Sequence, residues 1–209
     1  MKIFLTGGSR GIGLVIKNTL EQAGIEVIHP TSEELDLSID FNIEPILVDG
    51  FIHCAGINII ADHKNINQAE LFQIFQINTF SFVSLCSKLN FTQGSNIVAI
   101  GSLYSTQTKE SRIQYTMSKH ALYGAVKTLA LEKASDKIKV NIISPGFVDT
   151  TLTRKNNSKE RIDFLNENIP LGLTDSCEIA NLCLYLIKQN NAITGQNIII
   201  DGGYSLKSI

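Results

Sequence analysis

The chain has 209 residues, of which 44% are hydrophobic, so it can bury a substantial core and falls within the size range of one domain, residues 1–209. Its 18 Lys and Arg against 20 Asp and Glu leave a net charge of -2 without a strongly basic block, so we do not expect nucleic acid as a main partner. No apolar run approaches the roughly 18 residues that a membrane helix needs, so we expect no membrane-spanning segment.

The first apolar segment is interrupted by Thr6-Gly7-Gly8, which is too early for a signal peptide. The cysteines form no CxxC pair, and most of them lie in apolar segments, where a free thiol packs like a small hydrophobic group. We therefore expect a cytoplasmic protein with reduced cysteines and no metal site.

Short apolar runs alternate with longer segments of helical period, which predicts the α/β class: one doubly wound Rossmann-type domain whose parallel sheet of about seven strands carries helices on both faces. The expected strands cover residues 2–6, 26–28, 50–54, 96–100, 139–143 and 197–200. The expected helices cover residues 12–23, 69–89, 115–134 and 176–188.

Two segments do not follow this alternation. Pro30 ends the second strand, and the next strand follows so soon that a full crossover helix has little room. Residues 146–174, rich in Asn, Thr, Lys and Arg, contain no clear element. They would lie beyond the carboxyl end of a strand, where a mobile substrate lid and a solvated surface loop are equally supported.

A glycine-rich turn joins the first strand to the first helix. Gly7 permits a tight turn, Gly11 lets the backbone approach a pyrophosphate, and Gly13 lets the helix pack closely against the strand. The free amides at the helix N-terminus favour an anion. We expect a dinucleotide to be bound by the residues of this turn, namely Gly7, Ser9, Arg10, Gly11, Ile12 and Gly13.

The end of the second strand bears on the choice of cofactor. No carboxylate follows the strand immediately, and Arg10 can reach a 2'-phosphate, so NADP(H) is favoured. Glu33 and Glu34 lie a few residues further on and leave NAD(H) as the alternative.

Tyr115 and Lys119 are spaced i and i+4 at the start of a helical segment, so both side chains can address one ligand. A nearby ammonium would stabilise the phenolate and lower the tyrosine pKa toward the range useful for proton transfer. Ser102 follows the strand at 96–100 and its hydroxyl can bind a carbonyl oxygen there. On spacing alone, Ser105 and Tyr104 are alternatives to Ser102.

Taken together, the motifs of this chain resemble those of the short-chain dehydrogenase/reductase family in its standard short form. The motifs, in chain order, are Thr6-Gly7 with Gly11-Ile12-Gly13, His53-Cys54-Ala55-Gly56, Asn78, Ser102, Tyr115 with Lys119, Ser144-Pro145-Gly146 and Asp201-Gly202-Gly203. The resemblance implies that Tyr115 is the general acid or base, that Lys119 binds the nicotinamide ribose and lowers the tyrosine pKa, that Ser102 positions the carbonyl, and that Asn78 supports a proton relay.

The resemblance also implies the remaining cofactor contacts and the assembly. Asp36-Leu37 would contact adenine, Ala55-Gly56 would lie beside the cofactor, and Pro145-Gly146 with Val148 would border the nicotinamide. A homodimer or homotetramer is implied, with the helices at 69–89 and 115–134 as contact surfaces.

Three features depart from the family pattern. His53-Cys54 stands where two asparagines are usual, the second crossover helix is truncated, and the acidic or basic residue that usually follows the second strand and contacts the ribose is not clearly present. We expect all three to affect the adenosine side. The leading hypothesis is a reductase or dehydrogenase that exchanges hydride between the cofactor and a small carbonyl or alcohol substrate. The alternative is a non-catalytic NADP(H)-binding regulatory or scaffold protein. The polar segment at 103–114 hints at a polar substrate over a long acyl chain.

Overall fold

The computed structural model describes residues 1–206, without the side chains of Leu152, Lys155 and Asn156, so the end of the expected domain at residue 209 lies outside the described residues. Within that range the strands form one parallel sheet of six strands in the order β2-β1-β3-β4-β5-β6, close to the seven expected. The strands are β1 (Lys2–Thr6), β2 (Glu26–Ile28), β3 (Leu47–His53), β4 (Asn90–Ile100), β5 (Lys139–Pro145) and β6 (Asn197–Ile200).

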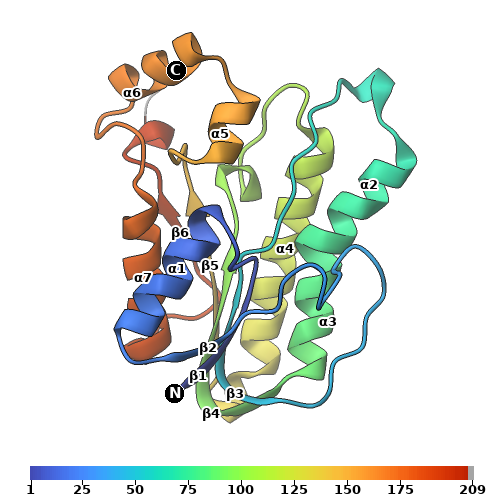
Figure 1. The fold of residues 1–209 in the computed structure, drawn as a ribbon, viewed down its shortest axis with the longest axis vertical. Coiled ribbons are helices and arrows are strands. Elements are labelled where there is room, and N and C mark those ends of the chain that lie inside the picture. The colour runs from blue at the N-terminus through green and yellow to red at the C-terminus, as the bar shows by residue number, and fades with distance from the viewer. Residues whose placement is uncertain (207–209) are drawn as a thin grey trace.

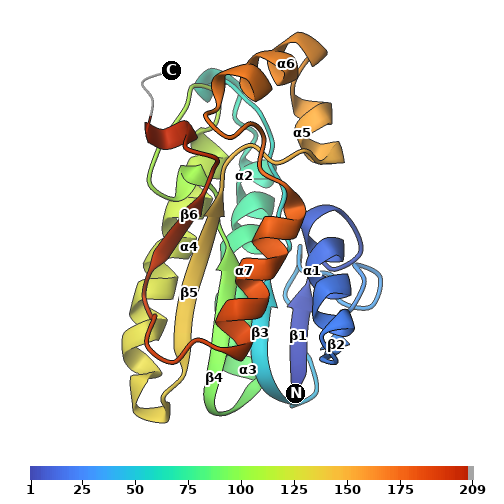
Figure 2. The same cartoon turned by 90° about the vertical axis from the view of Figure 1, so that its left-hand side faces the viewer.

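Helices cover both faces of the sheet, as the alternating pattern predicts. Figures 1 and 2 show α1 and α7 on one face, α2, α3 and α4 on the other, and α5 and α6 above the carboxyl ends of the strands. The helices are α1 (Gly11–Gln22), α2 (Gln68–Phe75), the π-helical turn η2 (Gln76–Phe80), α3 (Ser81–Lys88), α4 (Ile113–Glu132), α5 (Thr151–Asn156), α6 (Lys159–Asn168) and α7 (Ser176–Lys188). Short 3-10 turns occur at η1 (His63–Asn65), η3 (Leu103–Ser105), η4 (Ala134–Asp136) and η5 (Tyr204–Leu206).

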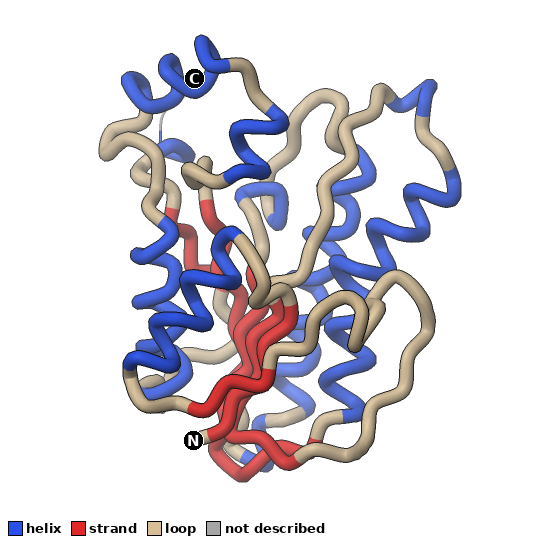
Figure 3. The backbone as a smooth tube through the Cα atoms, viewed as in Figure 1, coloured by secondary structure: helices blue, strands red, loops and turns tan. Residues whose placement is uncertain are grey.

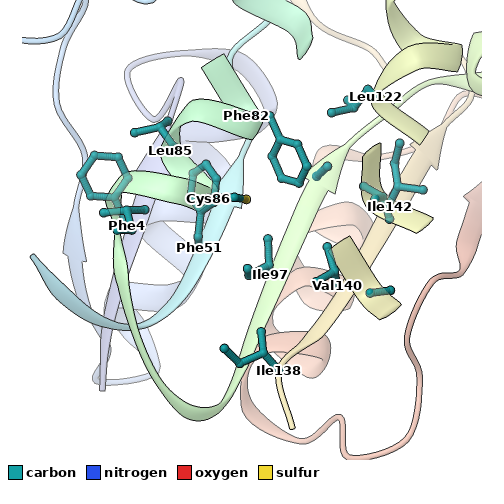
Figure 4. Packing of buried hydrophobic residues seen from close by; sticks show 14 of the residues in the cluster. Phe4, Phe51, Phe82, Leu85, Cys86, Ile97, Leu122, Ile138, Val140 and Ile142 are labelled. Carbon is teal, nitrogen blue, oxygen red and sulfur yellow. The ribbon is translucent and has the colours of Figure 1, made fainter. Parts of the chain in front are cut away.

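The core has two layers because successive side chains of a strand point to opposite faces of the sheet. In β4, Ile97 and Ala99 pack toward α3 and α4, whereas Val98 and Ile100 pack toward α1 and α7. Figure 4 shows the first layer, in which the rings of Phe51 and Phe82 stack with their centroids 5.9 Å apart. Both layers hold the sheet rigid up to its carboxyl edge.

Residues 29–46, between β2 and β3, contain only turns and extended chain, so the expected truncation of the second crossover helix is confirmed. Figure 3 shows this connection as a long loop around one side of the molecule. Phe41 anchors it by inserting into the first core layer. β2, a strand of three residues, forms one edge of the sheet. A short edge strand offers little backbone for unwanted pairing with another chain.

The expectation of a segment without elements at 146–174 was wrong, because α5 and α6 lie there. Thr150 and Ser158 cap these helices by accepting hydrogen bonds from the amides of Thr153 and Arg161, both at 3.3 Å. The polar composition of this segment explains why the sequence did not predict the two helices. Among its described residues, α6 buries only Leu165, so it lacks the apolar stripe that marks an amphipathic helix.

The expected helix at 69–89 also differs in detail. It is interrupted by η2, where one extra residue per turn shifts the register between α2 and α3. The interruption places Asn78 and Thr79, both buried, on the side that faces α4.

Candidate active site

The glycine-rich turn has the shape that a bound dinucleotide requires. A Cβ on Gly13 would lie 1.9 Å from the carbonyl oxygen of Gly7, and a Cβ on Gly7 would lie 2.7 Å from the amide nitrogen of Ala55. Gly11 has a φ of 54° and open space around its Cα. Only glycine fits the first two positions, and the third leaves room for a ligand to approach the backbone.

The N-terminus of α1 points free amides at this space. Arg10 is the N-cap residue, but its side chain makes no capping hydrogen bond, and the first turn contains no acidic residue. Uncapped amides and the positive end of the helix dipole suit a pyrophosphate. The turn, with Ser9 exposed and Ile12 half-buried beside it, therefore fits the expected dinucleotide.

The end of β2 lies against the same turn, because a Cβ on Gly8 would meet the Cβ of His29 at 3.1 Å. Arg10 is exposed. The Glu34 carboxylate accepts hydrogen bonds from the Thr31 amide at 2.8 Å and the Thr31 hydroxyl at 3.0 Å, and these bonds lower its pKa. Glu34 thus has local partners, whereas the Arg10 guanidinium faces solvent.

Ser102 lies where β4 gives way to η3, at the carboxyl edge of the sheet. Its hydroxyl accepts a hydrogen bond from the Tyr104 amide at 3.3 Å, and the Ser105 hydroxyl accepts one from the Ser102 amide at 3.2 Å. Ser105 is buried under this turn and supports it, whereas Ser102 is half-buried and interacts with the Tyr115 side chain. The geometry selects Ser102 over Ser105 as the hydroxyl at the site.

Tyr115 lies in the first turn of α4 with its ring against that of Tyr104. The two ring centroids are 5.8 Å apart, and the planes meet edge to face at 82°. Burial raises the pKa of Tyr115 to about 12, although a hydrogen bond from Ser102 and the charge of Arg112 oppose the shift. The phenol is therefore protonated at neutral pH and is suited to donate a proton.

Lys119 lies one turn further along α4 and is 3% exposed. Its Nζ donates a hydrogen bond of 2.8 Å to the Ile100 carbonyl and lies 5.7 Å from the centroid of the Tyr115 ring. Burial lowers the pKa of Lys119 to about 8. The lowered tyrosine pKa expected from this ammonium is not found: burial dominates, and the cation that opposes the rise is Arg112.

Asn78 is fully buried in η2, and its side-chain amide is saturated. The oxygen accepts a hydrogen bond from the Ile57 amide at 2.9 Å, and the nitrogen donates to the Ile57 carbonyl and the Ser118 hydroxyl, both at 3.0 Å. Gly56 lies between Asn78 and Lys119, since a Cβ there would lie 3.3 Å from Asn78 Oδ1 and 3.7 Å from Lys119 Nζ. Asn78 therefore fixes the loop that follows β3 beside the lysine.

His53 and Cys54, which we expected to affect the adenosine side, lie within range of the Lys119 charge. His53 is fully buried, and its Nδ1 is 2.9 Å from the Thr6 hydroxyl. Burial, followed by repulsion from Lys119, lowers the pKa of His53 to about 3, so the ring is neutral. Burial likewise raises the pKa of the Cys54 thiol to about 12, and Lys119 opposes that shift. Sequence reasoning missed this proximity because it arises across neighbouring elements.

Of the other expected cofactor residues, Pro145, Gly146 and Val148 lie at or just beyond the carboxyl end of β5. Pro145 ends β5, and Gly146 packs so closely on Asp201 that a Cβ would lie 2.6 Å from the aspartate Cβ. Val148 is buried and forms a bridge with Thr174. Asp36 is exposed and accepts hydrogen bonds from the Ser38 amide and hydroxyl at 2.8 and 2.7 Å, whereas Leu37, like Ala55, is half-buried.

The described residues lack two other features, a membrane-spanning helix and a metal-binding cluster. Across residues 1–206, no helix combines the length and apolar character needed to cross a bilayer. In the same part of the chain, no group of three or more His, Cys, Asp and Glu side chains could hold a metal ion.

Residues 46–205 match a family described as enoyl-(acyl carrier protein) reductase. A mouse 3-oxoacyl-[acyl-carrier-protein] reductase is 29% identical over 96% of this chain and 96% of its own length. A short-chain dehydrogenase family protein from Francisella tularensis is 27% identical, with a TM-score of 0.82 over 99% of each chain.

Two similar structures were solved with cofactor. A proposed 2-deoxy-d-gluconate 3-dehydrogenase from Agrobacterium tumefaciens with bound NADP is 26% identical, with a TM-score of 0.84 over 99% of this chain and 96% of its own. A 4-hydroxyisoleucine dehydrogenase complexed with NADH is 25% identical, with a TM-score of 0.78 over 99% of this chain and 100% of its own.

Proposed function

The chain belongs to the short-chain dehydrogenase/reductase family of oxidoreductases, and we propose that it is an NADP(H)-dependent carbonyl reductase or alcohol dehydrogenase that acts on a ketone or a secondary alcohol. The observation that carries the proposal is the convergence of Ser102, Tyr115 and Lys119 at the sheet edge. These side chains lie at the edge that also carries the glycine-rich turn.

The protein's own residues have distinct tasks in this reaction. The Ser102 hydroxyl holds the substrate oxygen, and Tyr115, protonated at neutral pH, donates a proton to that oxygen during reduction. In the reverse direction Tyr115 accepts the proton. When bound, the nicotinamide supplies hydride to the carbonyl carbon or takes it from the alcohol carbon.

Lys119 and Asn78 support this proton transfer. The Lys119 ammonium is held against Ile100, 5.7 Å from the centroid of the Tyr115 ring, and we assign to it the binding of the nicotinamide ribose. Asn78 positions the loop at Ala55-Gly56 beside that ammonium through its two bonds to Ile57. We propose that Asn78, beside Lys119, supports the relay that returns a proton to Tyr115.

The cofactor is NADP(H) in preference to NAD(H). Arg10 lies at the N-terminus of α1, close to the end of β2, and is exposed, so it can bind a 2'-phosphate. Glu34, the nearest carboxylate after β2, bonds to Thr31. The NADP bound to the Agrobacterium relative agrees with this preference, and the NADH bound to the 4-hydroxyisoleucine dehydrogenase keeps NAD(H) as the alternative.

We further propose a homodimer or homotetramer. Large apolar side chains are exposed on α2, η2 and α3 and at the start of α4, the segments expected as contact surfaces. They are Phe72, Phe80, Val83, Ile113 and Met117. The free cysteines favour a reducing cytoplasm.

Replacing Tyr115 with Phe tests the function. The variant keeps the ring and its contact with Tyr104 but lacks the acid, so kcat for ketone reduction should fall by about a hundredfold or more while NADPH affinity stays similar. Full retained turnover would refute the role of Tyr115. A protein that binds NADPH but reduces no carbonyl compound in its wild-type form would instead be a non-catalytic binder.

A further inference from the structure

Two cationic side chains act on Tyr104, whose ring packs against that of Tyr115: Arg112 from the loop before α4 and Arg161 from α6, and both also act on Lys109 of the same loop. Burial raises the pKa of Tyr104. Arg112 opposes that rise through its charge and a hydrogen bond, and Arg161 opposes it through its charge. Burial, then the charges of Arg161 and Arg112, lower the pKa of Lys109. Segments some fifty positions apart in the chain thus bring like charges together.

These cations lack compensating carboxylates. Among the side chains that the structure describes, none of Lys109, Arg112 and Arg161 forms an ion pair, and the carboxylate that acts on Lys109 is its neighbour Glu110. The Arg161 guanidinium instead lies 5.0 Å from the centroid of the Phe164 ring. A cluster of unpaired like charges raises the free energy of the empty site, which an anion would lower.

Arg154 provides the contrast within the same region. Its guanidinium donates two hydrogen bonds to the Asp149 carboxylate, at 2.8 and 2.7 Å. The fold therefore supplies a carboxylate to a cation of α5 and supplies none to the cations around Tyr104.

The backbone fixes Arg112 with respect to Tyr115. Arg112 is the N-cap residue of α4, and its carbonyl accepts a hydrogen bond of 2.8 Å from the Thr116 amide. The preceding residue, Ser111, has a φ of 60°, a left-handed conformation that costs a non-glycine residue free energy, and its carbonyl accepts a hydrogen bond of 3.3 Å from the Ala61 amide. The loop is thus held in a conformation that keeps Arg112 three residues from the proton donor.

On the basis of the oxidoreductase function above, we propose that the substrate is a small carbonyl or hydroxy compound with a carboxylate or phosphate group close to the reacting carbon. Lys109, Arg112 and Arg161 bind this anionic group. Arginine and lysine bind both kinds of anion through charge-assisted hydrogen bonds. Arg112 lies close enough to Tyr115 to stabilise its phenolate, so an anion that binds it lies next to the reaction. A carrier-bound acyl thioester fits less well, because its phosphate is a pantetheine arm away from the carbonyl.

The test compares matched charged and neutral substrates with the wild-type enzyme and NADPH or NADH. The pairs are acetoacetate and methyl acetoacetate, levulinate and methyl levulinate, and dihydroxyacetone phosphate and dihydroxyacetone. We expect kcat/KM for the charged member of at least one pair to exceed that of the neutral member by about tenfold or more, since each charge-assisted bond contributes that much. The pair with the larger ratio distinguishes a carboxylate from a phosphate.

Variants then assign the preference to the three cations. Arg112→Gln and Arg161→Gln should each lower the charged-to-neutral ratio by about tenfold. Lys159→Gln, which removes an exposed charge from the same helix as Arg161, is the matched control and should leave the ratio unchanged. Added salt should lower kcat/KM for the charged member more than for the neutral one.

The outcomes separate the two proposals. Equal turnover of charged and neutral members, or a preference that survives both arginine substitutions, would overturn the inference and leave the oxidoreductase intact. Turnover of an acyl carrier protein thioester far above that of every small anion would also overturn it. If no carbonyl compound is reduced, the proposed function fails. Calorimetric titration with acetoacetate and dihydroxyacetone phosphate then tests the anion site separately. Binding that is lost in Arg112→Gln supports the anion site, and binding that is absent, or that the substitution does not change, rejects it.

Discussion

Lys119 Nζ donates a hydrogen bond of 2.8 Å to the carbonyl oxygen of Ile100, which joins the second turn of α4 to the last residue of β4. This one bond holds the ammonium at the sheet edge, between the glycine-rich turn and Tyr115. It also places a charge in a buried setting, where its protonation responds to pH near neutrality.

The first prediction concerns that response. Because burial lowers the pKa of Lys119 to about 8, the ammonium is present below that pH and is lost as the pH rises through it. We expect cofactor affinity, followed by nicotinamide fluorescence between about pH 6 and pH 10, to fall above about pH 8 by at most about tenfold per pH unit. Lys119→Met should bind more weakly at neutral pH and lose this dependence, and a slope that persists in the variant would assign it to another group.

A second prediction concerns the glycine-rich turn. Gly13→Ala places a Cβ at 1.9 Å from the Gly7 carbonyl oxygen, so the turn must shift. We expect the free energy of unfolding to fall by about 1–3 kcal/mol, as for overpacked sites, and NADPH affinity to fall by about tenfold or more. The matched control is Gly124→Ala in α4, where a Cβ meets nothing within 4 Å, and which should raise stability by about 0.5–1 kcal/mol. Equal behaviour of the two variants in denaturant and titration would contradict this account of the turn.

Arg10 supplies a third prediction, on cofactor choice. Arg10→Ala should weaken NADPH binding by roughly tenfold to a hundredfold and change NADH binding little, because only NADPH carries the 2'-phosphate. Lys17→Ala, which removes a charge from α1 that pairs with Glu21 at 3.4 Å, is the control for general electrostatic attraction. If both cofactors weaken equally in Arg10→Ala, Arg10 does not select between them.

The fourth prediction concerns the stability of the fold at acid pH. The pKa of His53 is lowered from 6.5 to about 3 on folding, so between these values the unfolded chain binds a proton that the folded chain does not. Its contribution to stability is complete above about pH 6.5 and is lost as the pH falls, by about 1.4 kcal/mol per pH unit. Urea unfolding of wild type and His53→Asn from pH 7 to pH 4 should show a shallower slope for the variant. Parallel slopes would mean that His53 is not the group responsible.

Much of the fold follows from local pattern. The alternation of strands and helices, the turn at Gly7 to Gly13 and the i, i+4 spacing of Tyr115 and Lys119 are properties of short segments. The structure has all three, although several elements differ in their bounds, as β4 does by starting at Asn90 and not at Asn96. The helix α6 escaped prediction because it exposes most of its residues, and α5 because it is short, so the capping residues Thr150 and Ser158 were the available signal for the two helices.

What the sequence by itself determined is therefore the inventory of the site: which residues carry hydroxyl, phenol, ammonium and amide groups, and the edge of the sheet where they gather. Only the tertiary structure decided their chemistry. Burial reversed the expected direction of the Tyr115 pKa, and the packing placed His53 within range of the Lys119 charge and Tyr104 within range of both Arg112 and Arg161. The physical reason is that desolvation and charge interactions depend on packing between segments distant in the chain, and no local pattern of residues encodes that packing.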